Sequence, residues 1–144
     1  MDRASFWSLI ELIEGDGKDD SSTNLEPLIS ELSKKSGEQI ADFYEMLAQV
    51  THALDTSQHY RRFSWFRGHS DTFLYTRLSV VAQGSSFYHQ VLENPKMFPK
   101  RSSRWLEELL YVADEAFRKS TGGEFDRDST VCIESFSNEK GWAK

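Results

Sequence analysis

The stretch from Ser36 to Leu54 constrains the fold more than any other part of the sequence, because it carries the signals of one long helix. The run Ser36-Gly37-Glu38-Gln39 matches the capping box, in which a serine and a glutamine satisfy free N–H groups at a helix start. Apolar side chains then follow at helical spacing: Ile40, Phe43, Leu47, Val50 and Leu54. Such a stripe needs a partner surface, so the sequence predicts that this helix is the spine of a packed domain.

Other segments repeat this pattern, and helix-breaking residues separate them. We expect further helices at 6–13, from Thr23 or Asn24, from Ser70 or Asp71 to Gly84, from Ser85 or Ser86 to just before Pro95, and from Ser102 or Ser103 to the "STGG" run at 120–123. One strand-like run, residues 129–136, is too short and solitary to form a sheet. The sequence predicts an all-α fold, a single compact domain of about six helices, over residues 1–123. Residues 124–144 are expected to be a short irregular or strand-like C-terminal tail, packed on the domain or extending from it.

Composition narrows the class of protein. The 144 residues are 38% hydrophobic and 13% aromatic, which is typical of a folded domain and not of a disordered chain. No apolar run reaches the roughly 18 residues of a membrane span, and the first residues lack the basic region of a signal peptide. The single cysteine, Cys132, excludes an intramolecular disulfide and a zinc site built on cysteines. We expect a cytoplasmic protein with no membrane contact and no cofactor.

The net charge of −6 is distributed unevenly along the chain. Residues 1–59 hold 4 Lys or Arg against 12 Asp or Glu (−8), residues 60–104 hold 8 against 2 (+6), and residues 105–144 hold 5 against 9 (−4). A basic centre between acidic flanks is unusual, and each sign of charge indicates a different class of partner.

The leading hypothesis is a non-enzymatic, protein-binding domain that uses the acidic flank. Its sharpest form is an inhibitor or immunity-type protein that neutralises a basic toxin, because complementary charge steers association. The candidate partner-binding residues are Asp16, Asp19, Asp20, Glu38, Asp42 and Glu45. The run His69-Ser70-Asp71 holds the residue types of a catalytic triad, but neighbours at a helix start point apart, so Ser70 or Asp71 is expected to cap a helix.

The alternative hypothesis is a nucleotide or nucleic-acid site in the basic segment 60–104, where arginines would bind phosphate and aromatic rings would stack on bases. Its candidate residues are Arg61, Arg62, Arg67 and Arg77 with Trp65 and Tyr75, and Lys100, Arg101 and Arg104 are expected to join them in space. A simpler account pairs the basic centre internally with the acidic first and third helices. Separately, Trp7, Trp65 and Trp105 are expected to anchor the core rather than to form a ligand cage, since tryptophan is highly buried on average.

A third, distant alternative is a metal-dependent enzyme. His52, Asp55 and His59 stand at helical spacing on the far side of the expected spine helix, and imidazole with carboxylate suits a divalent ion. A fourth ligand would have to come from elsewhere in the fold.

Several segments also resemble a known bacterial family. "FWSLIELI" (residues 6–13) is similar to its N-terminal signature, and "HSDTFLYTRLSVVAQG" (69–84) resembles its central block through Ser70, Asp71, Phe73, Arg77 and Gly84. Two later segments, "FYHQVLENP" and "EELLYVADEAFRKSTG", resemble the segments that follow in the family. The family is called domain of unknown function 4240, and the resemblance covers roughly residues 4–123 of this sequence. Thr76 and Ser79 stand where the family has aromatic residues, and the basic "YRRFSWFRG" replaces an apolar approach to the block. The resemblance implies a helical fold and no reaction.

Overall fold

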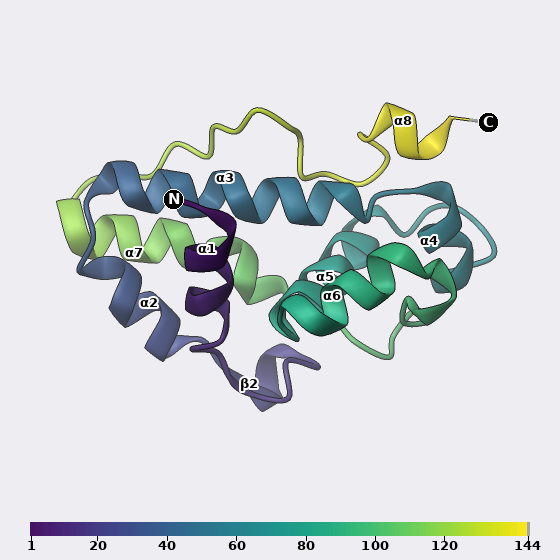
Figure 1. The fold of residues 1–144 in the computed structure, drawn as a ribbon, viewed down its shortest axis with the longest axis horizontal. Coiled ribbons are helices and arrows are strands. Elements are labelled where there is room, and N and C mark those ends of the chain that lie inside the picture. The colour runs from purple at the N-terminus through teal and green to yellow at the C-terminus, as the bar shows by residue number, and fades with distance from the viewer. Residues whose placement is uncertain (144) are drawn as a thin grey trace.

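The computed structural model describes residues 1–143 and confirms the all-α fold class, with eight α-helices in that range (Figure 1). They are α1 (Arg3–Ile10), α2 (Glu26–Ser33), α3 (Gly37–Ala53), α4 (Ser57–Phe63), α5 (Ser70–Ala82), α6 (Ser85–Glu93), α7 (Val112–Thr121) and α8 (Glu139–Trp142). Short 3-10 turns are η1 (Asp20–Ser22), η2 (Pro95–Met97) and η3 (Glu107–Tyr111). The strands β1 (Glu14–Gly15) and β2 (Thr23–Asn24) form one antiparallel pair. None of the described helices is both long and apolar enough to cross a membrane.

Helix α3 is the spine of the domain, as its sequence predicts. The capping box at its start is present, because the Ser36 side chain accepts from the Gln39 N–H and the Gln39 side chain accepts from the Ser36 N–H. The predicted apolar stripe is buried, and α3 packs against α1, α5 and α7. Helices α2 and α7 pack together at one end of the molecule, and α4, α5 and α6 lie toward the other end (Figure 1).

Several helix boundaries differ from the sequence prediction. The expected helix from Ser102 or Ser103 begins only at Val112, after the η3 turn. Thr23 and Asn24 form strand β2, and the Asn24 side chain accepts from the N–H of Glu26, where α2 begins. The separate helix α4 is a further difference, because the sequence pattern continued the spine helix as far as His59, whereas α3 ends at Ala53.

The start of α5 also corrects a prediction. Neither Ser70 nor Asp71 is the cap. His69 occupies the cap position, and its side chain makes no hydrogen bond to the first turn of the helix. Gly84, which the sequence placed at the end of α5, has φ +98° and stands at the cap position of α6, beyond the last helical residue Ala82. A residue without Cβ suits this turn because side chains disfavour positive φ.

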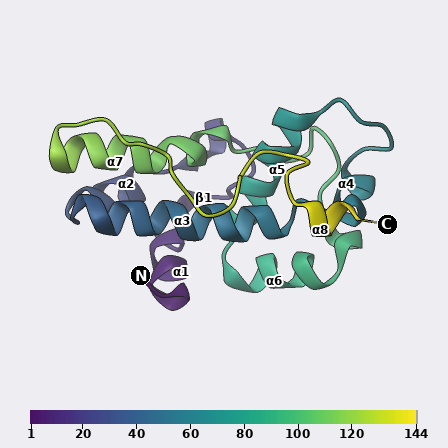
Figure 2. The same cartoon turned by 90° about the horizontal axis from the view of Figure 1, so that it is seen from above.

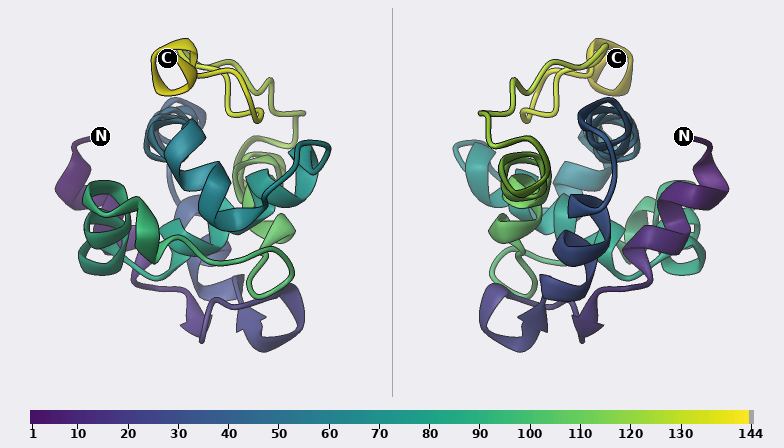
Figure 3. Two further views of the ribbon diagram at one scale, coloured as in Figure 1. Left: turned by 90° about the vertical axis from the view of Figure 1, so that its right-hand side faces the viewer. Right: turned by 90° about the vertical axis from the view of Figure 1, so that its left-hand side faces the viewer.

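Residues 124–143, called the C-terminal segment below, return along α3 and bring α8 beside α4 (Figure 2). No strand forms in the strand-like run 129–136. Ile133 is buried in the core, and Phe136, which has φ +68°, packs edge-on against Tyr60. The strand pair β1–β2 lies on the opposite side of the molecule from α8 (Figure 3).

Candidate functional site

Helix α4 and the turn after it present a tryptophan to solvent. Thr56 caps the helix by accepting from the N–H of His59, and Tyr60 and Phe63 bury its inner face. The hydroxyl groups of Tyr60 and Ser64 both donate to the carbonyl of Phe66, at 2.8 and 3.0 Å, which folds the chain into a tight turn. The Trp65 side chain at the tip of this turn is 90% exposed, and Phe66 is 44% exposed.

Basic side chains from two segments surround these rings. Arg61 and Arg62 lie on the outer face of α4, and the Arg101 N–H donates to the carbonyl of Phe63, which holds the loop after η2 against the end of α4. The Arg101 guanidinium lies 5.7 Å from the centre of the Phe66 ring. We call this region the basic-aromatic surface; its exposed members are Arg61, Arg62, Trp65, Phe66, Arg67, Lys96, Lys100 and Arg101.

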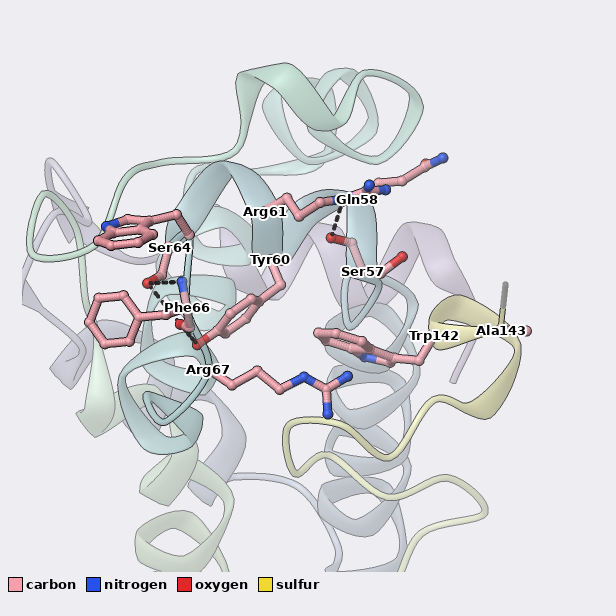
Figure 4. A pocket seen from close by; sticks show the side chains of 10 residues that line it. Ser57, Gln58, Tyr60, Arg61, Ser64, Phe66, Arg67, Trp142 and Ala143 are labelled. Atoms are coloured by element: carbon pink, nitrogen blue, oxygen red, sulfur yellow. Dashed lines mark hydrogen bonds between the residues drawn. The ribbon is translucent and has the colours of Figure 1, made fainter.

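Three pockets of about 480, 440 and 380 Å³ open on the basic-aromatic surface, and Arg61 lines all three. The largest, between α4 and α8, is lined by Ser57, Gln58, Tyr60, Arg61, Ser64, Trp65, Phe66, Arg67, Trp142 and Ala143 (Figure 4). We call it the α4–α8 pocket. No Asp or Glu lines any of the three pockets, so a negatively charged ligand would meet no like charge on their walls.

The cations of this surface have no carboxylate partner in the described part of the chain. Within residues 1–143, ion pairs join Lys34 to Glu31, Lys119 to Glu26, Arg127 to Asp114 and the N-terminal amine to Asp42. None of these involves a Lys or Arg from the basic segment 60–104. The expected internal pairing of this segment with the acidic helices therefore forms no ion pair in the described range, although the charges of Asp55 and Asp16 raise the pKa values of Arg77 and Arg104 against the effect of burial.

The tryptophans and Tyr75 divide between core and surface. Trp7 is buried, as the sequence predicts, but Trp65 is almost fully exposed and Trp105 is 39% exposed, so neither anchors the core. Tyr75 is half-buried on α5 and lines none of the three pockets, so the structure does not bring it to the basic-aromatic surface. Of the three cations expected to join in space, Lys100 and Arg101 do so, whereas Arg104 donates to the Asp16 carbonyl instead.

Arg77 corrects the sequence-based assignment of a phosphate-binding arginine, because its side chain is 0% exposed. Its terminal nitrogens donate to the carbonyl of Thr51 at 3.0 Å, the carbonyl of Ile133 at 3.2 Å and the hydroxyl of Ser135 at 2.9 Å. Burial lowers the pKa of Arg77 to about 10, and the nearby negative charge of Asp55 acts in the opposite direction. Arg77 therefore joins α5 to the end of α3 and to the C-terminal segment and is not accessible to a ligand.

The three proposed metal ligands are not brought together. His52 bonds to the Cys132 carbonyl, and His59 lies on α4 and not on α3, where its ring bonds to the Thr56 hydroxyl and the Val91 carbonyl. Among residues 1–143, no group of three or more His, Cys, Asp or Glu side chains is arranged to hold a metal ion.

Asp55 instead holds the C-terminal segment in place through hydrogen bonds. Its carboxylate is fully buried and accepts from the backbone N–H groups of Phe136, Ser137 and Asn138, at 3.0, 2.8 and 3.0 Å. It also accepts from the indole N–H of Trp142 at 2.9 Å. Hydrogen bonds to a carboxylate are among the stronger ones in proteins, so these four bonds fix α8 beside α4.

The acidic residues predicted to bind a partner lie in two separate places. Asp16, Asp19 and Asp20 belong to the loop around η1, and the others belong to α3, on different sides of the molecule (Figures 1 and 3). Most of them accept internal hydrogen bonds: Asp16 from Ser22, Asp19 from Ser21 and Ser22, Asp20 from the Glu108 N–H, and Glu45 from Gln49 and Thr130. Asp42 pairs with the N-terminal amine, and only Glu38 of the six is both exposed and free of side-chain hydrogen bonds within the described range.

Local surroundings shift the pKa values of the three loop carboxylates in different directions. A hydrogen bond from the Ser22 hydroxyl is the main reason that the pKa of Asp16 is lowered, and a hydrogen bond from the Ser21 hydroxyl has the same effect on Asp19. Asp20 differs, since its partial burial raises its pKa. These carboxylates stabilise local turns and the contact with η3, and they do not form one continuous acidic face.

Sequence reasoning missed Trp142 as a member of the candidate site. Trp142 stands in a polar tail, and its indole lies 4.8 Å from the guanidinium of Arg67. A tryptophan among polar residues was the only local signal. The partner that positions it, Asp55, lies 87 positions earlier in the chain.

Residues 1–119 match the family model described as "Protein of unknown function (DUF4240)". The chain belongs to the DUF4240 family. No curated protein and no solved structure matches the chain. In this DUF4240 protein, α4 and the loop after η2 lie inside the matched range, whereas Trp142 and the rest of α8 lie outside it.

Proposed function

We propose that this DUF4240 protein binds single-stranded nucleic acid through the basic-aromatic surface. The observation that carries the proposal is the Trp65 indole, 90% exposed among cations that have no carboxylate partner within residues 1–143. Proteins that bind single strands combine basic grooves, which follow the phosphate backbone, with aromatic side chains on which bases stack. Trp65 and Phe66 supply the rings, and Arg61, Arg62 and Lys100 supply charge around them.

Charge distribution favours a flexible single strand over a duplex. The protein is acidic overall, and the cations of the basic-aromatic surface come from α4, the turn after it and the segment around η2, which packs against α4 at one end of the molecule (Figure 1). A rigid duplex would extend past this end into the field of the acidic flanks, whereas a single strand can bend away from them. Its bases are also free to stack on Trp65, which the paired bases of a duplex are not.

The protein-binding hypothesis stays a prediction. It would place a basic partner, such as a toxin, against carboxylates that lie on different sides of the molecule and mostly serve internal hydrogen bonds. The basic-aromatic surface instead gathers cations and exposed rings in one place. For this reason we favour nucleic acid, and we treat an acidic protein segment as the competing occupant of the same surface.

Fluorescence anisotropy with a labelled single strand of about 20 nucleotides tests the proposal at about 50 mM salt, where phosphate contacts are strongest. We expect Trp65→Ala to weaken binding by at least about fivefold, because stacking contributes roughly 1–3 kcal/mol per base. The double change Arg61→Ala with Arg62→Ala should flatten the dependence of affinity on salt, by about 0.7 in the logarithmic slope for each phosphate that is no longer neutralised.

Arg118→Ala is the matched control. Arg118 is exposed on α7, at the opposite end of the molecule from α4, so this change removes one positive charge away from the surface (Figure 1). The proposal is wrong if the unchanged protein binds no single strand at low salt. It is also wrong if a polyglutamate chain competes as well as the oligonucleotide, because the surface would then recognise negative charge without bases.

A further inference from the structure

The α4–α8 pocket combines aromatic walls with positive charge at the size of a small-molecule site. Its volume of about 480 Å³ lies in the usual range for such sites. Tyr60 and Trp142 supply aromatic surface from two elements, and Arg61 and Arg67 supply positive charge. Figure 4 shows the two arginines on opposite sides of the pocket with the Trp142 ring between them.

Trp142 is held in one orientation before any ligand arrives. Its indole N–H donates to Asp55, whose carboxylate is fixed by backbone N–H groups of the C-terminal segment. The Phe136 ring packs edge-on against the indole, with centres 5.0 Å apart and an interplanar angle of 77°. A ring fixed in this way loses little conformational entropy when a ligand stacks on it, so more of the contact energy appears as affinity.

Arg67 lies on one face of this ring and keeps its donors unused. Its guanidinium carbon is 4.8 Å from the centre of the Trp142 ring and 5.4 Å from that of Phe136. Cation–π contact of this kind positions a guanidinium without occupying its N–H groups. The Arg67 side chain makes no hydrogen bond or ion pair with another residue of the described range 1–143, and Arg61 uses only its Nε, toward the Ser57 carbonyl.

We propose that the α4–α8 pocket binds one nucleotide of the strand. The base stacks on the face of Trp142 opposite Arg67, the phosphate binds the free N–H groups of Arg67 beside the edge of the ring, and Arg61 adds positive charge from across the pocket. The side chains of Ser57 and Gln58 also line the pocket and form no hydrogen bond within residues 1–143, so they are available to the base edge or the sugar. This proposal rests on the proposed function and names a subsite within it, completed by a segment outside the family match.

The chemistry of the pocket favours a nucleotide over its separate parts. Inorganic phosphate or a sugar phosphate would leave the Trp142 face bare, and a nucleoside would leave both arginines unpaired. An acidic peptide offers carboxylates without the planar ring that the fixed indole suits.

Titration of AMP into the full chain, followed by calorimetry and by quenching of tryptophan fluorescence, tests the proposal. We expect Arg67→Ala to weaken AMP binding by at least about tenfold, because hydrogen bonds between charged groups are removed. Trp142→Ala should weaken it by at least about fivefold, because the base has no ring to stack on. Arg67 is exposed, so Arg67→Ala tests the pocket even if Trp142→Ala loosens the C-terminal segment, and Arg118→Ala should bind AMP like the unchanged protein.

Further outcomes separate this proposal from the function on which it rests. Adenosine and ribose 5-phosphate should each bind at least about tenfold more weakly than AMP, and equal binding by either one overturns the nucleotide assignment. If the protein binds the longer single strand but not AMP at about 1 mM, the pocket proposal falls and the proposed function stands. If the protein binds neither the longer strand nor AMP, both the pocket proposal and the proposed function are wrong. AMP binding that is unchanged in Arg67→Ala also overturns the pocket proposal.

Discussion

Arg77 shows how the surroundings of one residue decide its role. Its guanidinium is buried and donates to Thr51, Ile133 and Ser135, so it joins three parts of the chain. We expect Arg77→Met to lower the free energy of unfolding by about 3 kcal/mol, because two buried carbonyls and a hydroxyl lose their donor. Urea unfolding followed by circular dichroism measures this loss.

Arg62→Met is the control, since Arg62 is exposed and the same atoms are removed. It should change stability by less than about 0.5 kcal/mol. Equal stabilities for the two variants would show that the buried bonds of Arg77 contribute nothing. The sequence did not reveal this role, because Ile133 and Ser135 lie 56 and 58 positions after Arg77 and no local pattern connects them.

His59 makes stability depend on pH. It is buried, its Nε2–H donates to the Val91 carbonyl, and its Nδ1 bonds to the Thr56 hydroxyl. Burial lowers the pKa of His59 below its ordinary 6.5, and the bond to Val91 opposes this in part. Below pH 6.5 the unfolded chain therefore binds a proton that the folded protein does not, and stability falls as pH falls.

We expect His59→Gln to flatten the decrease in the free energy of unfolding between about pH 7 and pH 5, even though it lowers stability at neutral pH. Urea unfolding at several pH values measures the slope. His89→Gln is the control, since His89 is an exposed residue on α6. If His59→Gln keeps the slope of the unchanged protein, another group causes the pH dependence.

At the scale of the helix, two serines that look alike in the sequence have different roles. Ser36 caps α3 and accepts from the Gln39 N–H at 3.2 Å, whereas Ser70 is the first residue of α5 and its side chain caps nothing. We expect Ser36→Ala to cost about 1 kcal/mol of stability, the usual value of a helix cap, and Ser70→Ala to be nearly neutral. Thermal unfolding of both variants under one set of conditions compares them, and equal losses would contradict the assignment.

Local signals explain which helices the sequence predicted well. The capping box and apolar stripe of α3 lie within one stretch of chain, so its start and buried face were predictable. Helix α4 has only the Thr56 cap and a short run, and its inner face packs against distant residues such as Phe73 and Phe98. Its orientation, and with it the exposure of Trp65, depends on tertiary contacts that periodicity does not show.

At the scale of the whole molecule, the sequence predicted the all-α class and the uneven charge, but not where the charges lie. Segments of opposite sign were expected to pair, yet the ion pairs within residues 1–143 leave the basic segment 60–104 without carboxylate partners. The path of the chain places the basic-aromatic surface away from the loop around η1 and the start of α3, while α8, from the acidic C-terminal flank, packs beside α4. For this reason the candidate site became visible only in three dimensions, and its Trp142 came from a segment that pattern reasoning treated as a tail.

This charge separation predicts how affinity depends on the length of a bound strand. Residues outside 60–104 carry a net charge of −12, from −8 and −4, so a strand that extends past the basic-aromatic surface enters a repulsive field. We expect affinity at low salt to rise up to about 8 nucleotides and then level off, whereas affinity for an extended basic groove would continue to rise. Anisotropy with strands of about 4, 8, 16 and 30 nucleotides measures this dependence.

The same measurement at about 0.5 M salt is the control. The Debye length is then short, so the repulsion is screened, and any remaining dependence on length reflects only the number of positions at which the protein can bind along the strand. A steady increase in affinity with length at low salt would show that the acidic flanks do not limit the site.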